Sequence, residues 1–123
     1  MEYLYLKWLD YETNKKYLIG ALFRDKQKRK YYFKLSKSHV EKAIEEKVIS
    51  KQILPFSDYD KIYESDEIFA IFKIRLPRIE RYSEEELKFL LEELDMKEYD
   101  EFEYLRKTKG ELMTDNFIVE EEK

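Results

Sequence analysis

The chain has 123 residues, of which 43% are hydrophobic and 16% aromatic, and this composition predicts one folded domain spanning residues 1–123. The absence of cysteine excludes disulfides and thiolate metal sites. The net charge of −4 conceals two unlike halves, because residues 1–61 carry +5 and residues 62–123 carry −9. No apolar run reaches the roughly 20 residues needed to cross a bilayer, so we expect a cytoplasmic protein.

The first third of the chain has the alternating pattern of an antiparallel meander. Leu4, Leu6 and Trp8 fall on one face of a predicted strand, with polar and tyrosine side chains between them. Gly20, at the centre of another strand, indicates a β-bulge or a close approach of two backbones. The three predicted strands cover residues 2–8, 17–23 and 31–35.

A helix is predicted over residues 39–48, because Ser38 and Glu41 have the spacing of a capping box and apolar residues follow at helical intervals. The polar and aromatic stretch 52–67 comes next. Its Pro55 indicates an extended loop or a short edge strand.

Residues 72–82, FKIRLPRIERY, gather three arginines around a Leu-Pro step. Ser65 is the predicted N-cap of a helix that should end before the proline. We interpret the segment as a helix–Pro–helix corner, in which Arg75 meets the helix dipole while Arg78 and Arg81 balance the glutamates that follow.

The C-terminal half is predicted to be helical. Ser83 and Glu86 form a second capping box before an apolar stripe along one face of the helix, made of Leu87, Leu90, Leu91 and Leu94. A further helix over residues 99–107 should stop at Gly110.

A last strand over residues 116–119 and an acidic tail over residues 120–123 complete the predicted elements. The fold class is therefore α+β. We expect a small antiparallel sheet, a partly barrel-like meander, packed with three to four short helices.

Residues of the kinds that carry catalysis or hold cofactors are sparse. His39 is the single histidine and has no partner at metal-ligand spacing, which argues against catalytic triads and typical zinc sites. With two glycines in the chain, no glycine-rich loop can cradle a phosphate. We therefore expect no enzymatic activity, no metal and no cofactor.

The basic stretch 24–37 supports a nucleic-acid interface, because cations can neutralise phosphates and aromatic rings can stack on bases. It equally describes a hairpin with a solvated tip, and both interpretations stay open. In the first, the protein binds nucleic acid or is a phage or mobile-element inhibitor. The residues concerned are Arg24, Lys26, Lys28, Arg29, Lys30, Tyr31 and Tyr32.

Residues 68–119 carry an order of features that resembles the N-terminal subdomain of HipA-type serine/threonine kinases. The matching features are Phe69 and Phe72, Leu76–Pro77, Arg78 or Arg81, the 87–94 helix, DEFEYLRKTKG (100–110) and the closing NFIV. The chain departs from the family at GELMTDN (110–116), and it contains no kinase catalytic-loop or metal-binding signature. The resemblance therefore implies a module related to the kinase's opening subdomain, without its chemistry.

Stand-alone proteins of this kind are subunits of split toxin–antitoxin systems, where they restrain a shortened kinase. The resemblance thus implies a non-enzymatic, antitoxin-like module that binds a HipA-like kinase. The aromatics least explained by a strand or helix face are the predicted contact residues, namely Phe56, Tyr59 and Tyr63.

Overall fold

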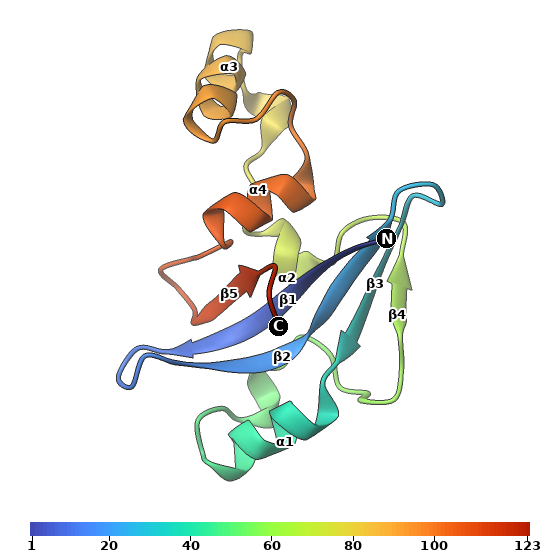
Figure 1. Ribbon diagram of the computed structural model, residues 1–123, viewed down its shortest axis with the longest axis vertical. Coiled ribbons are helices and arrows are strands. Elements are labelled where there is room, and N and C mark those ends of the chain that lie inside the picture. The colour runs from blue at the N-terminus through green and yellow to red at the C-terminus, as the bar shows by residue number, and fades with distance from the viewer.

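The computed structural model describes residues 1–123 and has the predicted α+β fold, with a five-stranded antiparallel sheet and four α-helices (Figure 1). The strands, in the spatial order β4-β3-β2-β1-β5, are β1 (Glu2–Asp10), β2 (Lys15–Asp25), β3 (Lys30–Leu35), β4 (Tyr63–Ser65) and β5 (Phe117–Glu120). The helices are α1 (Lys37–Glu45), α2 (Ala70–Lys73), α3 (Glu84–Glu93) and α4 (Glu101–Thr108), with 3-10 turns η1 (Lys51–Ile53) and η2 (Ile79–Arg81). The sheet is open, with the short strands β4 and β5 as its edges. No helix combines the length and the apolar character needed to cross a membrane.

The core lies on one face of the sheet, where alternate residues of the three long strands point inward. Leu4, Leu22 and Phe33 are fully buried and stand opposite one another across β1, β2 and β3. Helices α1, α2 and α4 cover this face with the buried side chains Val40, Ala43, Phe72, Phe102 and Leu105. The alternation predicted for the first strand is thus confirmed, and α3 buries no residue at all.

Gly20 lies beside a β-bulge and also allows a close approach, so both interpretations of this residue are confirmed. The β1–β2 register shifts between Leu6, which pairs with Gly20, and Lys7. A Cβ atom at Gly20 would lie 2.5 Å from the carbonyl oxygen of Lys34 and 2.6 Å from the Phe33 ring. Any side chain here would force β2 and β3 apart.

Two predicted helix starts are wrong. Helix α1 begins after Ser36, and no side chain caps it, so the capping box predicted at Ser38 does not form. Ser65 ends the edge strand β4, and its hydroxyl accepts a hydrogen bond from the Glu67 amide in a local turn. Pairing of Ser65 with β3 sets its backbone as a strand, and the helix that follows is reduced to the single turn of α2.

Arg75, just after α2, is buried and links this helix to the C-terminal strand and the loop before it. This role was not predicted from the sequence. The side chain of Arg75 is fully buried and donates hydrogen bonds to the carbonyl oxygens of Gly110 at 2.8 Å and Phe117 at 3.3 Å. Its guanidinium also pairs with the Asp115 carboxylate at 2.6 Å. The predicted pairing of Arg78 and Arg81 with nearby glutamates is not seen, since neither arginine forms an ion pair.

The acidic tail begins one residue later than predicted, because Glu120 belongs to β5. Its carboxylate forms ion pairs with the ammonium groups of Lys7 at 3.0 Å, Lys16 at 2.8 Å and Lys109 at 3.3 Å. Burial would raise the pKa of Glu120, but the three ammonium groups outweigh it and lower that pKa to about 2.

Candidate functional site

The loop aromatics that were predicted to contact a partner pack against the core. The ring centroid of Phe56 lies 4.9 Å from that of Phe33 and 4.2 Å from that of Tyr63. Tyr59 packs against the same cluster, and its carbonyl oxygen accepts a hydrogen bond from the Lys34 ammonium. Packing within the chain therefore accounts for all three aromatics without a partner.

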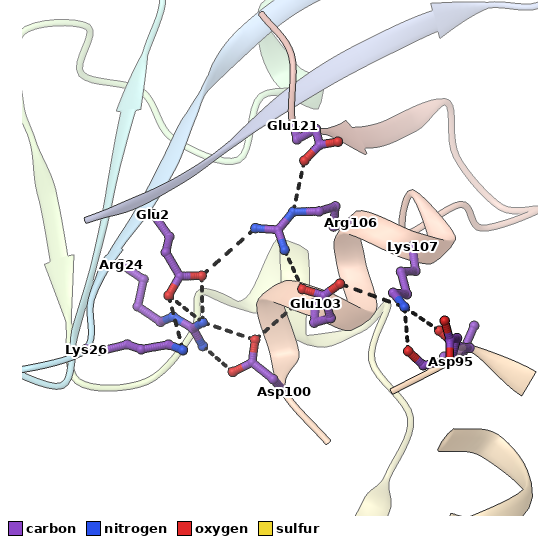
Figure 2. Close-up of polar contacts among 10 residues, drawn as sticks. Glu2, Arg24, Lys26, Asp95, Asp100, Glu103, Arg106, Lys107 and Glu121 are labelled. Atoms are coloured by element: carbon purple, nitrogen blue, oxygen red, sulfur yellow. Dashed lines mark hydrogen bonds and ion pairs between the residues drawn. The ribbon is translucent and has the colours of Figure 1, made fainter. Parts of the chain in front are cut away.

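Arg24, the first of the predicted phosphate contacts, is buried within the chain. Its side chain is 8% exposed and forms ion pairs with Asp100 at 2.7 Å and Glu2 at 2.9 Å (Figure 2). Burial would lower the pKa of Arg24, but the two carboxylates outweigh it and raise that pKa. Because its charge is neutralised inside the protein, the assignment of Arg24 as a phosphate contact is corrected.

The other cations of the hairpin are divided between pairing and exposure. Lys26 and Lys30 lie 3.4 Å and 2.6 Å from carboxylates of the same chain. Lys28 and Arg29, in the turn between β2 and β3, are exposed and form no ion pair. The exposed, unpaired cations of the predicted nucleic-acid interface are therefore confined to the tip of the hairpin.

The two hairpin tyrosines lie on opposite faces of the sheet. Tyr31 faces the core, with its ring centroid 6.1 Å from that of Phe102. Tyr32 stacks on Phe23 at 5.1 Å, and Phe23 in turn contacts Tyr3 at 5.6 Å. Together Tyr3, Phe23 and Tyr32 form an aromatic strip across three strands, on the face that the core helices leave open.

Residues 76–99, which we call the arm, project from the rest of the protein, which we call the body. The arm contains η2 and α3, and none of its residues is buried. In Figure 1, α3 lies at one end of the long axis, with α4 between it and the sheet.

The predicted capping box of α3 is confirmed, with hydrogen bonds of 3.1 Å in both directions between Ser83 and Glu86. The predicted apolar stripe of this helix does not reach the core, because Leu87, Leu90, Leu91 and Leu94 are only half-buried.

The arm presents an apolar patch framed by acids. Phe89 on α3 is 65% exposed. With the half-buried Tyr82 and Leu90 it forms a shallow groove of about 500 Å³, which Glu85, Glu86 and Glu93 also line. The arm carries eight acidic and four basic residues, so its net charge of −4 equals that of the whole chain.

Helix α4 connects the arm to the body through ion pairs with the body and hydrogen bonds to the arm (Figure 2). Near its start, Asp100 caps the helix by accepting a hydrogen bond from the Glu103 amide at 3.0 Å while it pairs with Arg24. Near its end, the Lys107 ammonium donates to the carbonyl oxygens of Leu94 at 2.6 Å and Asp95 at 2.8 Å, just beyond α3. The hydrogen bonds from Lys107 therefore hold the segment just after α3 close to α4.

A cavity of about 740 Å³, the neck cavity, lies where the arm leaves the body. One wall comes from the body, including Tyr31 of β3 and Lys73 of α2. The other includes residues 76–80 and Tyr99, at the two ends of the arm, and Glu101 at the start of α4. Sequence reasoning missed this cavity, because its walls come from segments far apart in the chain.

Comparisons of the chain with protein-family models, with curated proteins and with solved structures returned no match. No group of three or more His, Cys, Asp or Glu side chains is arranged to hold a metal ion. The arm and the neck cavity are therefore the features on which a functional proposal rests.

Proposed function

We propose that this chain is a non-enzymatic regulatory module of the cytoplasm that binds and restrains a partner protein through its arm. The observation that carries the proposal is the exposed Phe89, beside Tyr82 and Leu90, on a helix that buries none of its residues. Aromatic residues with an apolar centre and a polar rim are typical of protein-binding surfaces. The patch is left uncovered by the rest of the chain, which a binding partner would explain.

The charge of the arm favours a partner with a basic surface. Glu85, Glu86 and Glu93 surround the apolar groove, and Lys88 is the one cation within α3. Complementary charges accelerate association and suppress wrong partners, while burial of the aromatic patch supplies affinity. We therefore expect binding to Phe89 and its neighbours to weaken with increasing salt without being lost.

The partner that the family resemblance implies is a HipA-like kinase, and the setting is a toxin–antitoxin pair. The arm lies inside residues 68–119, the stretch that carries this resemblance. An antitoxin-like module of this kind acts by occupying a surface of the kinase, which requires no chemistry of its own. A standard interface of roughly 800 Å² per partner is within reach of a protein of this size.

Binding to a HipA-like kinase encoded beside this chain tests the proposal. Phe89→Asp should weaken the complex at least tenfold, measured by isothermal titration calorimetry. The matched control is Tyr11→Asp, because Tyr11 is 61% exposed in the β1–β2 turn, away from the arm. Absence of binding by the unaltered protein would contradict the kinase assignment. Tight binding that survives Phe89→Asp would contradict the role of the arm.

Nucleic-acid binding is the second candidate function, and the aromatic strip favours it. Tyr3, Phe23 and Tyr32 form a continuous row on the face without core helices, and Lys28 and Arg29 lie in the adjoining turn. Rings on an open sheet face can stack on the bases of a single strand while nearby cations contact its phosphates. A phage or mobile-element inhibitor could use the same surface.

Fluorescence anisotropy with a labelled single-stranded oligonucleotide distinguishes this candidate from the first. Reversal of the tip charges, Lys28→Glu with Arg29→Glu, should abolish binding, and the affinity of the unaltered protein should fall steeply with salt. Lys97→Glu on the arm, an exposed cation outside the hairpin, is the matched control. An affinity unchanged by the tip reversal would reject this function.

A further inference from the structure

The neck cavity is lined by a carboxylate, that of Glu101, which forms no ion pair within the chain. Glu101 is the first residue of α4, and its Oε2 atom is buried with no hydrogen-bond partner. No lysine or arginine forms an ion pair with it. Burial raises the pKa of Glu101 and outweighs the nearby charges of Arg24 and Lys73, which lower it, so this charge is costly to keep out of water. A cation that reached this carboxylate would relieve that cost.

The other charges around the cavity are arranged so that a negative excess remains. Asp66 is paired with Lys30 at 2.6 Å, and Glu67 lies 4.0 Å from Lys73. The charged lining groups left outside these pairs are Glu80, Glu101 and one cation, Arg78. The cavity is therefore suited to a positively charged occupant.

The uncharged walls of the cavity further restrict the kind of cation. Tyr31 and Tyr99, both half-buried, line it together with apolar side chains such as Ile68 and Leu76. Aromatic faces attract cations, and a guanidinium suits them best because it is planar and weakly hydrated. A volume of about 740 Å³ is larger than a bare ammonium ion needs and lies in the range of small-molecule sites.

We propose that the neck cavity binds an alkylguanidinium group, with Glu101 as its counter-ion and the rings of Tyr31 and Tyr99 as its walls. Two sources share this chemistry: a small free guanidinium compound, and an arginine side chain of a bound polypeptide. Neither source depends on the arm patch at Phe89, so this site stands independently of the function proposed above. Because one wall of the cavity belongs to the arm and the other to the body, an occupant would contact both.

Titrations followed by two-dimensional amide NMR test the site, with agmatine and the peptide acetyl-Gly-Arg-Gly-amide as probes. Both carry the guanidinium, and we expect them to shift the amide signals of Ile68, Ala70, Tyr99 and Glu101 while leaving those of β1 in place. Equal affinities would identify a site for a free small molecule. Tighter binding of the peptide would identify a site for an arginine side chain. Pentylurea, a neutral compound of similar shape, should give no shifts.

The variant Glu101→Gln keeps the shape of the side chain and removes its charge, so it should weaken binding of either probe at least tenfold. Glu98→Gln is the matched control, because Glu98 is exposed on the arm and does not line the cavity. Absence of shifts at the cavity with both charged probes would overturn the proposal. So would equal binding of pentylurea, a comparison that needs only the unaltered protein and holds even if Glu101→Gln does not fold.

Discussion

The body and the arm of this protein contain helices of similar length that differ in what they bury. Helix α4 places Phe102 and Leu105 in the core, whereas α3 carries a comparable number of apolar residues and buries none. Both helices begin with a side-chain cap, Asp100 in one and Ser83 in the other. The local signals that start a helix are therefore independent of the surface that covers it. An amphipathic helix without such a surface is where a partner is expected.

The largest expected contrast comes from the same substitution in the two helices. Phe102→Ala in α4 removes a fully buried ring and should cost about 3–5 kcal/mol of unfolding free energy. Phe89→Ala in α3 removes a ring that is 65% exposed and should stay within about 0.5 kcal/mol. Urea denaturation followed by circular dichroism measures both. Similar losses for the two variants would mean that α3 is part of the core after all.

The arginines around the Leu-Pro step show the same difference between a buried and an exposed side chain. Arg75→Met would leave the Gly110 and Phe117 carbonyl oxygens and the Asp115 carboxylate without their donor, at a cost of about 2–3 kcal/mol. Arg78→Met, three residues along and exposed, is the control and should change the unfolding free energy by less than about 0.5 kcal/mol. An equally small effect at Arg75 would show that solvent replaces these bonds.

Close spacing along the chain made some of these features predictable, and long separation hid the others. The capping box of Ser83 with Glu86 depends on neighbouring residues and was predicted, and a glycine inside a strand indicated the bulge or close approach found at Gly20. Arg75 meets Asp115 across 40 residues, and Arg24 meets Asp100 across 76. A cation's partner at such distances depends on how the elements pack, which the pattern of one segment does not contain.

The candidate sites follow the same rule. The loop aromatics Phe56, Tyr59 and Tyr63 looked unexplained only because their partners, such as Phe33, come from another element. The neck cavity is assembled from β3, α2, the arm and α4, so no single motif marks it. In contrast, the leucine stripe of α3 could not be placed from the sequence, because a helical stripe looks the same whether it faces a core or a partner.

The contribution of β5 to the stability of the body should depend on pH, through Glu120. The pKa of Glu120 in β5 is about 2, below its ordinary value near 4.5, so the folded state binds this proton less readily than the unfolded chain. The stabilisation is therefore complete above about pH 4.5 and is lost as the pH falls towards 2. Glu120→Gln should lower the unfolding free energy at pH 7, and its difference from the unaltered protein should vanish as the pH falls through about 2, in urea titrations at each pH. A destabilisation that persists at pH 2 would assign the role of Glu120 to packing.

The smallest effect is expected at the cap of the arm, and its location matters more than its size. Ser83→Ala removes the acceptor for the Glu86 amide and should cost about 1 kcal/mol of helix stability. Since α3 buries no residue, this loss should stay local: amide hydrogen exchange should accelerate within residues 84–93 and remain unchanged in β1 and β2. The matched substitution Asp100→Ala removes the cap of α4 and the partner of Arg24 together, so it should lower the stability of the whole body. If Ser83→Ala also accelerated exchange in the sheet, the arm and the body would unfold as one unit, and α3 could not be the independent, partner-ready helix that its exposed patch indicates.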